Sequence, residues 1–325
     1  MMKKIAVFLA VLAGISVQLS AKSGGEAAEN LANYPNKPVQ LVVPYGPGGG
    51  TDNFARIVMK YVNQKLDRPV VTINVEGAGG LIGAMQVYNA PGDGYTLLAH
   101  NPPDVATFTI LGQTDVNLWS ELETICAAVA DYNVISTNKA TGWKTVEDMI
   151  AYAKEHPGEV KIGSTVPNQG NTRRLINAMG LKGVIIPVPY DGGAALRTAL
   201  MGNHIQMDFN ACSDTRMVIE SGDYVPLLVL NGARIKSLPD VPTSIERKIN
   251  ITTIVPRGFY APKGTDPAIV KFWRDAIRAA VEDPACAADI EKLGVEPKYV
   301  NGPEMKQRIA DLVRELTPYF EELDK

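Results

Sequence analysis

The chain has few of the residues that build metal centres, disulfide frameworks or histidine-dependent active sites. Only three of its 325 residues are cysteine and only three are histidine. The cysteines are too scattered for a disulfide framework, and we expect three buried thiols, Cys126, Cys212 and Cys286. The histidines show no metal-ligand spacing. We therefore predict no metal ion and no cofactor.

A strong excess of charge of one sign is also lacking. Lys and Arg total 32 against 35 Asp and Glu, which gives a formal net charge of −3. Such a protein has no long-range attraction for nucleic acid or anionic lipid. We expect no nucleic-acid partner, and an anion that this protein binds must be held by local geometry.

A long apolar run is missing even at the start of the chain. Basic residues in Met1–Lys4 precede an apolar stretch, Ile5–Val17, which is shorter than the about 20 residues of a membrane-spanning helix. The small residues Ser20 and Ala21 follow, as in a cleavable secretory signal. We predict a signal peptide over residues 1–21 and a flexible leader over 22–33.

The most informative stretch that is present is glycine-rich, Pro44–Asp52 (PYGPGGGTD). It follows an apolar run, Val39–Val43, and precedes a helical pattern for which Thr51 or Asp52 is the expected N-cap. Backbone N–H groups at such a helix start attract anions. The glycines fit neither a Walker loop nor a dinucleotide fingerprint. A carboxylate or phosphate is therefore the expected ligand, and a tight turn without a ligand is the alternative.

Apolar runs alternate with helical patterns over most of the chain, which is typical of an α/β protein with mostly parallel sheets. About 300 residues after the signal exceed the usual size of one domain. Strands are predicted over 39–43, 70–74, 95–99, 124–129, 134–136, 160–163, 185–188, 205–210 and 227–230. Helices are predicted over 52–66, 145–155, 172–179, 194–201, 215–221, 267–282 and 304–322, the last kinked or interrupted at Pro318.

Six short segments in register resemble the periplasmic receptors of tripartite tricarboxylate transporters, the Bug family. The resemblance runs from Tyr34 to the C-terminal helix. The segments lie at 34–52, 77–83, 93–98, 188–192, 238–243 and 261–265.

This resemblance implies an α/β fold with two Rossmann-like lobes and a ligand cleft, of the type II periplasmic binding protein kind. Lobe 1 would hold residues 34–132 and 255–325, and lobe 2 residues 133–254. The implied protein is a periplasmic monomer and not an enzyme. It would capture a small organic carboxylate by hinge closure and deliver it to the membrane transporter subunits.

The candidate ligand-binding residues lie in loops at strand ends of both lobes. In lobe 2 we expect the start of a helix near Gly170 to face the first glycine loop, so that two helix N-termini hold one carboxylate without Lys or Arg. The candidates are Tyr45, Gly48, Gly49, Thr51, Asp52, Gly80, His100, Asn101, Ser164, Thr165, Gln169, Gly170, Asn171, Thr172, Arg174, Tyr190, Asp191 and Asn210.

Departures from the family pattern affect the identity of the ligand. Arg174 stands in the place of a family His and could pair with a second carboxylate, or it could be a solvated residue on the first helical turn. Val75 and Glu76 replace a usual Arg-Pro. A small di- or tricarboxylate is favoured, with an aromatic acid, an amino acid or a nicotinic-type acid open. A co-receptor for a sensor kinase and a secreted α/β hydrolase remain alternatives, although no G-x-S-x-G elbow is present.

Overall fold

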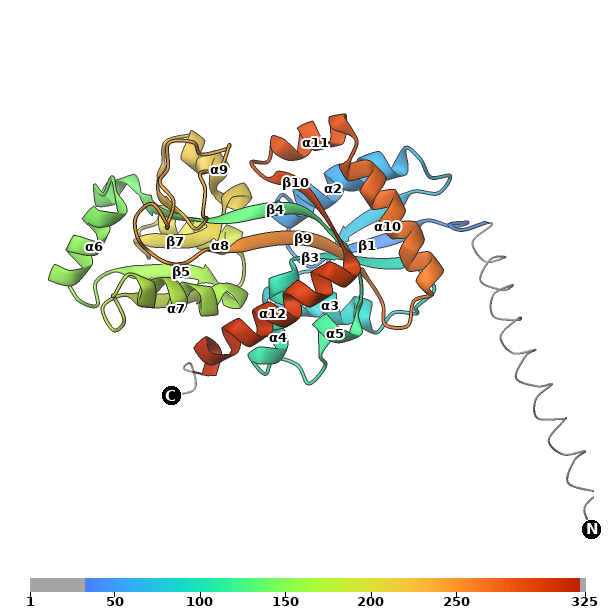
Figure 1. Ribbon diagram of the computed structural model, residues 1–325, viewed down its shortest axis with the longest axis horizontal. Helices are drawn as coiled ribbons and strands as arrows, with labels where there is room; N and C mark the ends of the chain where they lie inside the picture. The colour runs from blue at the N-terminus through green and yellow to red at the C-terminus, as the bar shows by residue number, and fades with distance from the viewer. Residues whose placement is uncertain (1–32, 322–325) are drawn as a thin grey trace, which may run out of the picture.

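The computed structural model describes residues 33–321, in which ten strands form one connected, two-part sheet (Figure 1). The strand order is β2-β1-β3-β9-β4-β7-β5-β6, and β8 and β10 also pair with β4. The strands are β1 (Val39–Val43), β2 (Val70–Asn74), β3 (Thr96–His100), β4 (Glu123–Asn138), β5 (Lys161–Thr165), β6 (Ile186–Tyr190), β7 (Met207–Ala211), β8 (Tyr224–Val229), β9 (Ile254–Ala261) and β10 (Glu296–Asn301).

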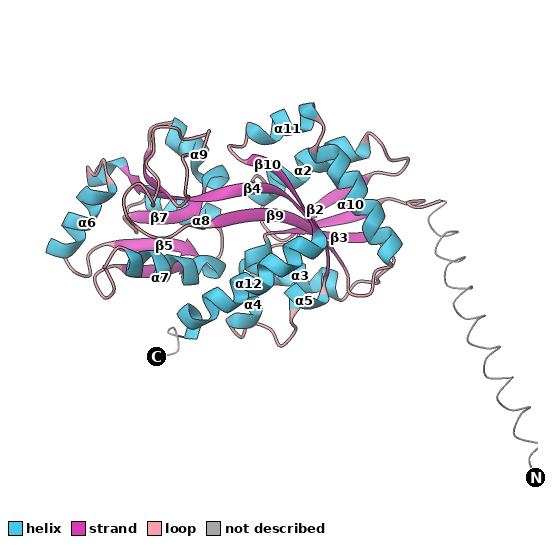
Figure 2. Cartoon of the chain, in the orientation of Figure 1, coloured by secondary structure: helices cyan, strands magenta, loops and turns pink. Residues whose placement is uncertain are grey.

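Helices cover both parts of this sheet (Figure 2). They are α2 (Gly50–Asn63), α3 (Leu81–Tyr88), α4 (Pro102–Ile110), α5 (Leu118–Glu121), α6 (Val146–Glu155), α7 (Gln169–Ala178), α8 (Gly193–Met201), α9 (Cys212–Glu220), α10 (Pro267–Val281), α11 (Pro284–Glu291) and α12 (Gly302–Glu321). The predicted α/β fold is confirmed, but the sheet is not mostly parallel, because β8, β9 and β10 run antiparallel to their neighbours and β4 runs antiparallel to β7.

Two long strands join the two parts of the molecule. Strand β4 pairs with β9 over residues 123–132 and with β7 over residues 133–137, so one strand runs through both parts (Figure 1). Strands β1, β2 and β3 are parallel in the first part, and β5, β6 and β7 are parallel in the second. Parallel strands turn their carboxyl ends to one edge, where the loops of the site collect.

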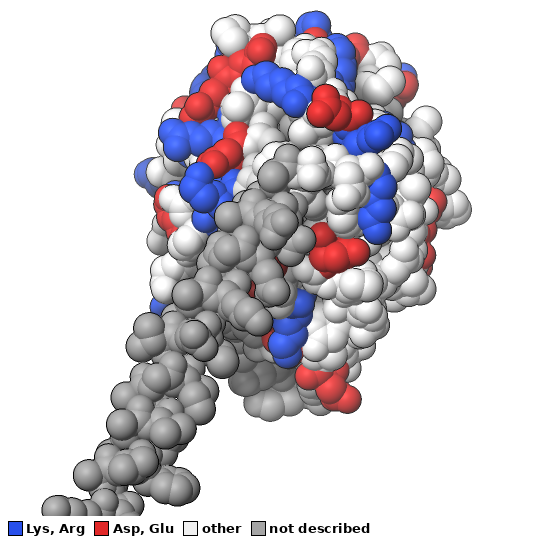
Figure 3. Space-filling model, turned by 90° about the vertical axis from the view of Figure 1, so that its right-hand side faces the viewer, with Lys and Arg blue, Asp and Glu red and all other residues white. Residues whose placement is uncertain are grey.

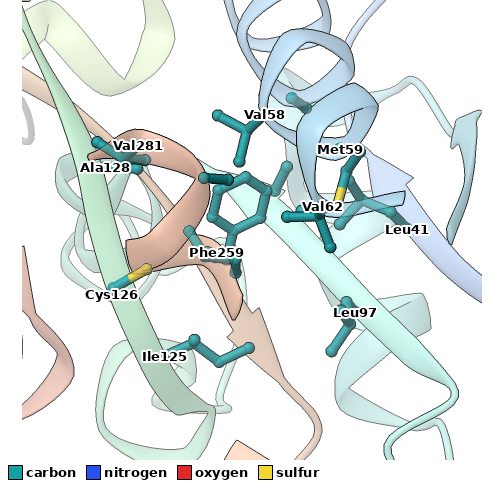
Figure 4. Packing of buried hydrophobic residues seen from close by; sticks show 14 of the residues in the cluster. Leu41, Val58, Met59, Val62, Leu97, Ile125, Cys126, Ala128, Phe259 and Val281 are labelled. Carbon is teal, nitrogen blue, oxygen red and sulfur yellow. The ribbon is translucent and has the colours of Figure 1, made fainter. Parts of the chain in front are cut away.

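Separate hydrophobic cores stabilise the two parts. The first core packs α2 and α10 on the sheet, with Leu41, Val58 and Phe259 buried between them (Figure 4). The second core, with Met149 and Phe209, comes from residues 135–251. We call the two parts lobe 1 and lobe 2, although the exact boundary at residue 132 within β4 stays a prediction.

Several sequence predictions are confirmed and others need correction. Thr145 and Asp148 form the predicted capping box of α6, and the three cysteines are buried free thiols. The strands predicted over 124–129 and 134–136 are one strand, β4, because the intervening residues continue its pairing with β9. Helix α12 is not interrupted at Pro318.

The start of α2 also differs from the prediction. Its N-cap is Gly49, because the helix begins at Gly50, so Thr51 and Asp52 lie inside its first turn, where their side chains form other hydrogen bonds. Strands β9 and β10 and helices α3, α4, α5 and α11 were not expected. The predicted signal peptide, and the leader up to residue 32, lie outside the described residues.

On the surface seen in Figure 3, basic and acidic side chains are intermingled, as the balanced composition suggests. No helix within residues 33–321 has both the length and the apolar character needed to cross a membrane.

Candidate functional site

A cleft of about 460 Å³ lies where the two lobes meet. Lobe 1 supplies the glycine loop before α2, the loop before α3, and Asn101 and Asp104 near the start of α4. Lobe 2 supplies the loop after β5, the start of α8, and residues around the start of α9. Arg257, on the crossing strand β9, also lines the cleft.

The glycine loop of lobe 1 is held in place by Asp52. This buried carboxylate accepts the N–H of Gly48 at 3.0 Å, the Nε of Arg56 at 2.9 Å and the Nδ2 of Asn74 at 2.9 Å. Burial acts to raise the pKa of Asp52, but these hydrogen bonds outweigh it and the pKa lies below its usual value. Asn74 also donates to the carbonyl of Tyr45 at 2.8 Å. Asp52 therefore shapes the loop from behind.

A second network fixes the floor of lobe 1. Tyr45 donates its hydroxyl to Oδ2 of Asp104 at 2.6 Å, and Asn101 donates its amide to the same oxygen at 2.9 Å. Thr51 donates to Oδ1 of Asn101 at 3.0 Å. Behind them, His100 is fully buried, and burial lowers its pKa to about 3, so its ring is neutral at neutral pH.

Arg257 connects the lobes at the base of the cleft. It is 2% exposed, and its Nη2 lies 2.9 Å from Oδ2 of Asp131, on the other crossing strand, β4. Its Nη1 donates to Thr51 of lobe 1 at 2.5 Å, and its Nη2 donates to Ser213 of lobe 2 at 2.6 Å. The guanidinium therefore ties both lobes to the crossing strands.

The N-terminus of α2 already faces an anion. Asp214, in the first turn of α9, accepts the N–H of Gly50 at 2.8 Å and lies 3.4 Å from Nη2 of Arg257. A Cβ atom on Gly50 would lie 2.5 Å from the same guanidinium nitrogen, so only glycine permits this close approach. The carboxylate of Asp214 thus bonds across the cleft to lobe 1.

The N-terminus of α8 is different, because it is open. Its N-cap, Gly192, supplies no side chain, and the first N–H groups of a helix have no partner within the helix. Asn210 lies beside it, and its Nδ2 hydrogen-bonds to no described residue although the side chain is only 3% exposed. Its Oδ1 accepts the N–H of Ala211 at 2.9 Å. A buried amide donor and the accessible N–H groups of the helix start are therefore left for a ligand.

Half of the predicted site residues line this cleft. They are Tyr45, Gly48, Gly49, Thr51, Gly80, Asn101, Thr165, Asp191 and Asn210. Asp52 and His100 lie behind the lining of lobe 1, and Tyr190 packs against a hydrophobic cluster of lobe 2.

The predicted loop at the start of α7 lies mostly beneath the cleft. Ser164 accepts hydrogen bonds from Gln169 at 2.6 Å and from Thr172 at 2.8 Å, and all three side chains are buried. Gly170 is buried in the same first turn. The helix of lobe 2 that opens on the cleft is therefore α8 and not α7, because the loop at Thr165–Asn168 stands between α7 and the cavity.

Arg174 and Asn171 line a different cavity, of about 270 Å³, beside α12. Arg174 forms an ion pair with Glu315 of α12 and donates to Oδ1 of Asn171 at 2.8 Å. Its guanidinium also lies 5.9 Å from the ring centre of Tyr319. The charge of Arg174 is thus matched by a protein carboxylate outside the cleft.

Sequence reasoning missed Arg257, Asp214 and the start of α8. An arginine within the apolar run Val255–Ala261 signals a buried and paired charge. Asp214 follows a predicted strand at the expected start of a helix, which is the position used for the other candidates. The tripeptide Asp191–Gly193 also lies between a predicted strand, 185–188, and a predicted helix, 194–201. No group of three or more potential metal ligands occurs within residues 33–321.

This architecture, two α/β lobes joined by crossing strands around a cleft, defines the class of periplasmic binding proteins. The model of the tripartite tricarboxylate transporter family receptor matches residues 54–324, and the chain belongs to that family. The resemblance inferred from the sequence is confirmed.

Individual relatives and solved structures are also similar to this chain. A Cupriavidus necator protein described as "UPF0065 protein in gbd 5'region" is 31% identical over 301 residues, covering 89% of this chain and 88% of that protein. The solved periplasmic binding protein BugD has a TM-score of 0.80 at 25% identity, covering 89% of this chain and 98% of BugD. The structure of R. palustris Rpa4515 with adipate has a TM-score of 0.83 at 24% identity, covering 89% and 97%.

Proposed function

We propose that this protein is a periplasmic receptor that captures a small organic carboxylate in the cleft and delivers it to a tripartite tricarboxylate-type membrane transporter. The observation that carries the proposal is the open N-terminus of α8 beside the unpartnered Nδ2 of Asn210. Helix N–H groups and a buried amide donor together bind a carboxylate. Each charge-assisted hydrogen bond contributes about 1.5–3 kcal/mol, so a few suffice for micromolar affinity.

The two lobes supply the rest of the mechanism. Strands β4 and β9 cross between them, and register shifts occur along their pairing at residues 124–126 and 127–129. Bending at these strands would open the cleft, and a bound ligand would close it. Closure would then present one defined surface to the transporter. The adipate in R. palustris Rpa4515 is a carboxylate of the proposed kind.

A thermal-shift screen of the protein without residues 1–21 tests the proposal. The panel contains organic acids, with sugars and inorganic phosphate as controls. We expect a higher melting temperature with one group of carboxylates, and recovery of the acid unchanged after incubation. A shift with sugars or phosphate alone would contradict the proposal, and consumption of the acid would favour the hydrolase alternative.

A further inference from the structure

We propose that the ligand of this cleft carries a cationic nitrogen next to its carboxylate, as an α-amino acid does. The inference rests on the proposed function, since it specifies the class of carboxylate. Its basis is a pair of opposite groups at the start of α8. A Cβ atom on Gly193 would lie 3.6 Å from Nδ2 of Asn210 and 3.5 Å from Cγ of Asp214. A hydrogen-bond donor and a carboxylate therefore converge on one point.

The donor is available because Asn210 is buried and its Nδ2 is unpartnered among the described residues. Together with the N–H groups of α8, it fits the carboxylate of a ligand. The acceptor also has capacity left. The carboxylate of Asp214 accepts Gly50 at one oxygen and lies near Arg257 at the other, whereas two carboxylate oxygens offer about four acceptor positions.

The charges that line the cleft also favour a ligand with a cationic group. Its lining contains four carboxyl groups, those of Glu76, Asp104, Asp191 and Asp214, against the guanidinium groups of Arg197 and Arg257. Arg257 is also paired with Asp131 behind the lining. A ligand with two carboxylates and no cation would add its charges to this excess, whereas an ammonium group would offset it.

Two of these carboxylates have no partner among the described residues. Glu76 in lobe 1 and Asp191 in lobe 2 form no hydrogen bond or ion pair with any residue in the described range 33–321. Glu76 lies over the glycine loop, because a Cβ atom on Gly46 would be 3.1 Å from its Oε2.

Matched acids test the inference by calorimetry. Each set contains an amino acid, its 2-hydroxy analogue and its desamino analogue, for example glutamate, 2-hydroxyglutarate and glutarate, and an aromatic set is measured beside it. In the set that binds, we expect the amino acid to bind at least tenfold more tightly than the desamino acid, with the hydroxy acid between them. Equal or tighter binding of the desamino acid would overturn the inference.

Variants that remove one negative charge but keep the shape of the side chain test whether charge causes the preference for an amino acid. Asp214→Asn keeps an acceptor for Gly50, and we expect it to reduce the preference for the amino acid at least fivefold. Glu76→Gln, exposed and in the other lobe, is the second variant if Asp214→Asn does not fold, and we expect a smaller reduction. Asp240→Asn, outside the cleft, is the control. An unchanged preference in both cleft variants would overturn the inference. Binding of neither amino acids nor other acids would instead refute the proposed function.

Discussion

The two faces of the cleft are built differently. On lobe 1, the polar groups around the glycine loop are bonded to one another, through Asp52 behind the loop and Asp104 at its side. On lobe 2, the start of α8 has no side-chain cap, and Asn210 keeps a buried amide donor unpartnered within the described residues. The glycine loop of lobe 1 is held by bonds within the protein, whereas the start of α8 in lobe 2 lies beside a buried donor that has no partner in residues 33–321.

This difference indicates that the two lobes have different roles in ligand binding. A loop whose hydrogen bonds are already made costs little to order when a ligand arrives, which is preorganisation. Buried donors without partners are costly, and a ligand that satisfies them gains affinity. We infer that lobe 1 is the rigid wall and that lobe 2 selects the ligand. Arg257, between them, holds both to the crossing strands.

We expect the largest effect from replacing Arg257, because its hydrogen bonds join both lobes to the crossing strands. In Arg257→Met, Asp131 is left as an uncompensated buried charge, and breaking such a pair costs about 3–5 kcal/mol. Urea unfolding followed by circular dichroism measures the loss. A loss below about 1 kcal/mol would show that Arg257 does not stabilise the junction of the lobes.

The buried histidine of lobe 1, His100, should make the stability of the protein depend on pH. His100 has a pKa of about 3 in the folded protein, against about 6.5 when unfolded, so below pH 6.5 the unfolded state binds the extra proton. Stability therefore falls as pH decreases from 6.5 toward 3, by up to about 1.4 kcal/mol per pH unit. In His100→Gln this part of the dependence disappears. Identical pH profiles of wild type and variant would contradict the assignment.

A side chain at the start of α8 blocks the open face. The Cβ atom of Gly193→Val would point to the space between Asp214 and Asn210, and we expect about tenfold weaker ligand binding or more, equal to about 1.4 kcal/mol, in a folded protein. Gly232→Val is the matched control, because a Cβ atom there meets nothing within 4 Å. Equal affinities of the two variants would remove α8 from the site.

The smallest effect is expected outside the cleft, at Arg174. Its partner Glu315 is 53% exposed, and such pairs contribute about 0–1 kcal/mol. Because Arg174 lines the other cavity and not the cleft, Arg174→Ala should change ligand affinity less than about twofold. Titration of dicarboxylates and monocarboxylates measures this. A selective loss of dicarboxylate binding would restore Arg174 as the partner of a second carboxylate.

The sequence is sufficient to predict the fold class, the family and the glycine loop, because strand–loop–helix patterns are local. It could not show that Arg174 is neutralised by Glu315, 141 residues away. Nor could it show that Asp214 reaches Gly50 across 164 residues. Which helix start of lobe 2 faces the cleft depends on how the loops stack, and a choice based on glycines near α7 therefore missed α8.

The most direct test is a crystal structure of the protein with the acid that gives the largest thermal shift. We expect carboxylate oxygens about 3 Å from the first N–H groups of α8 and from Nδ2 of Asn210. An acid bound in the cavity beside α12, or in the cleft with its carboxylate away from α8, would contradict the central claim that lobe 2 holds the ligand's carboxylate.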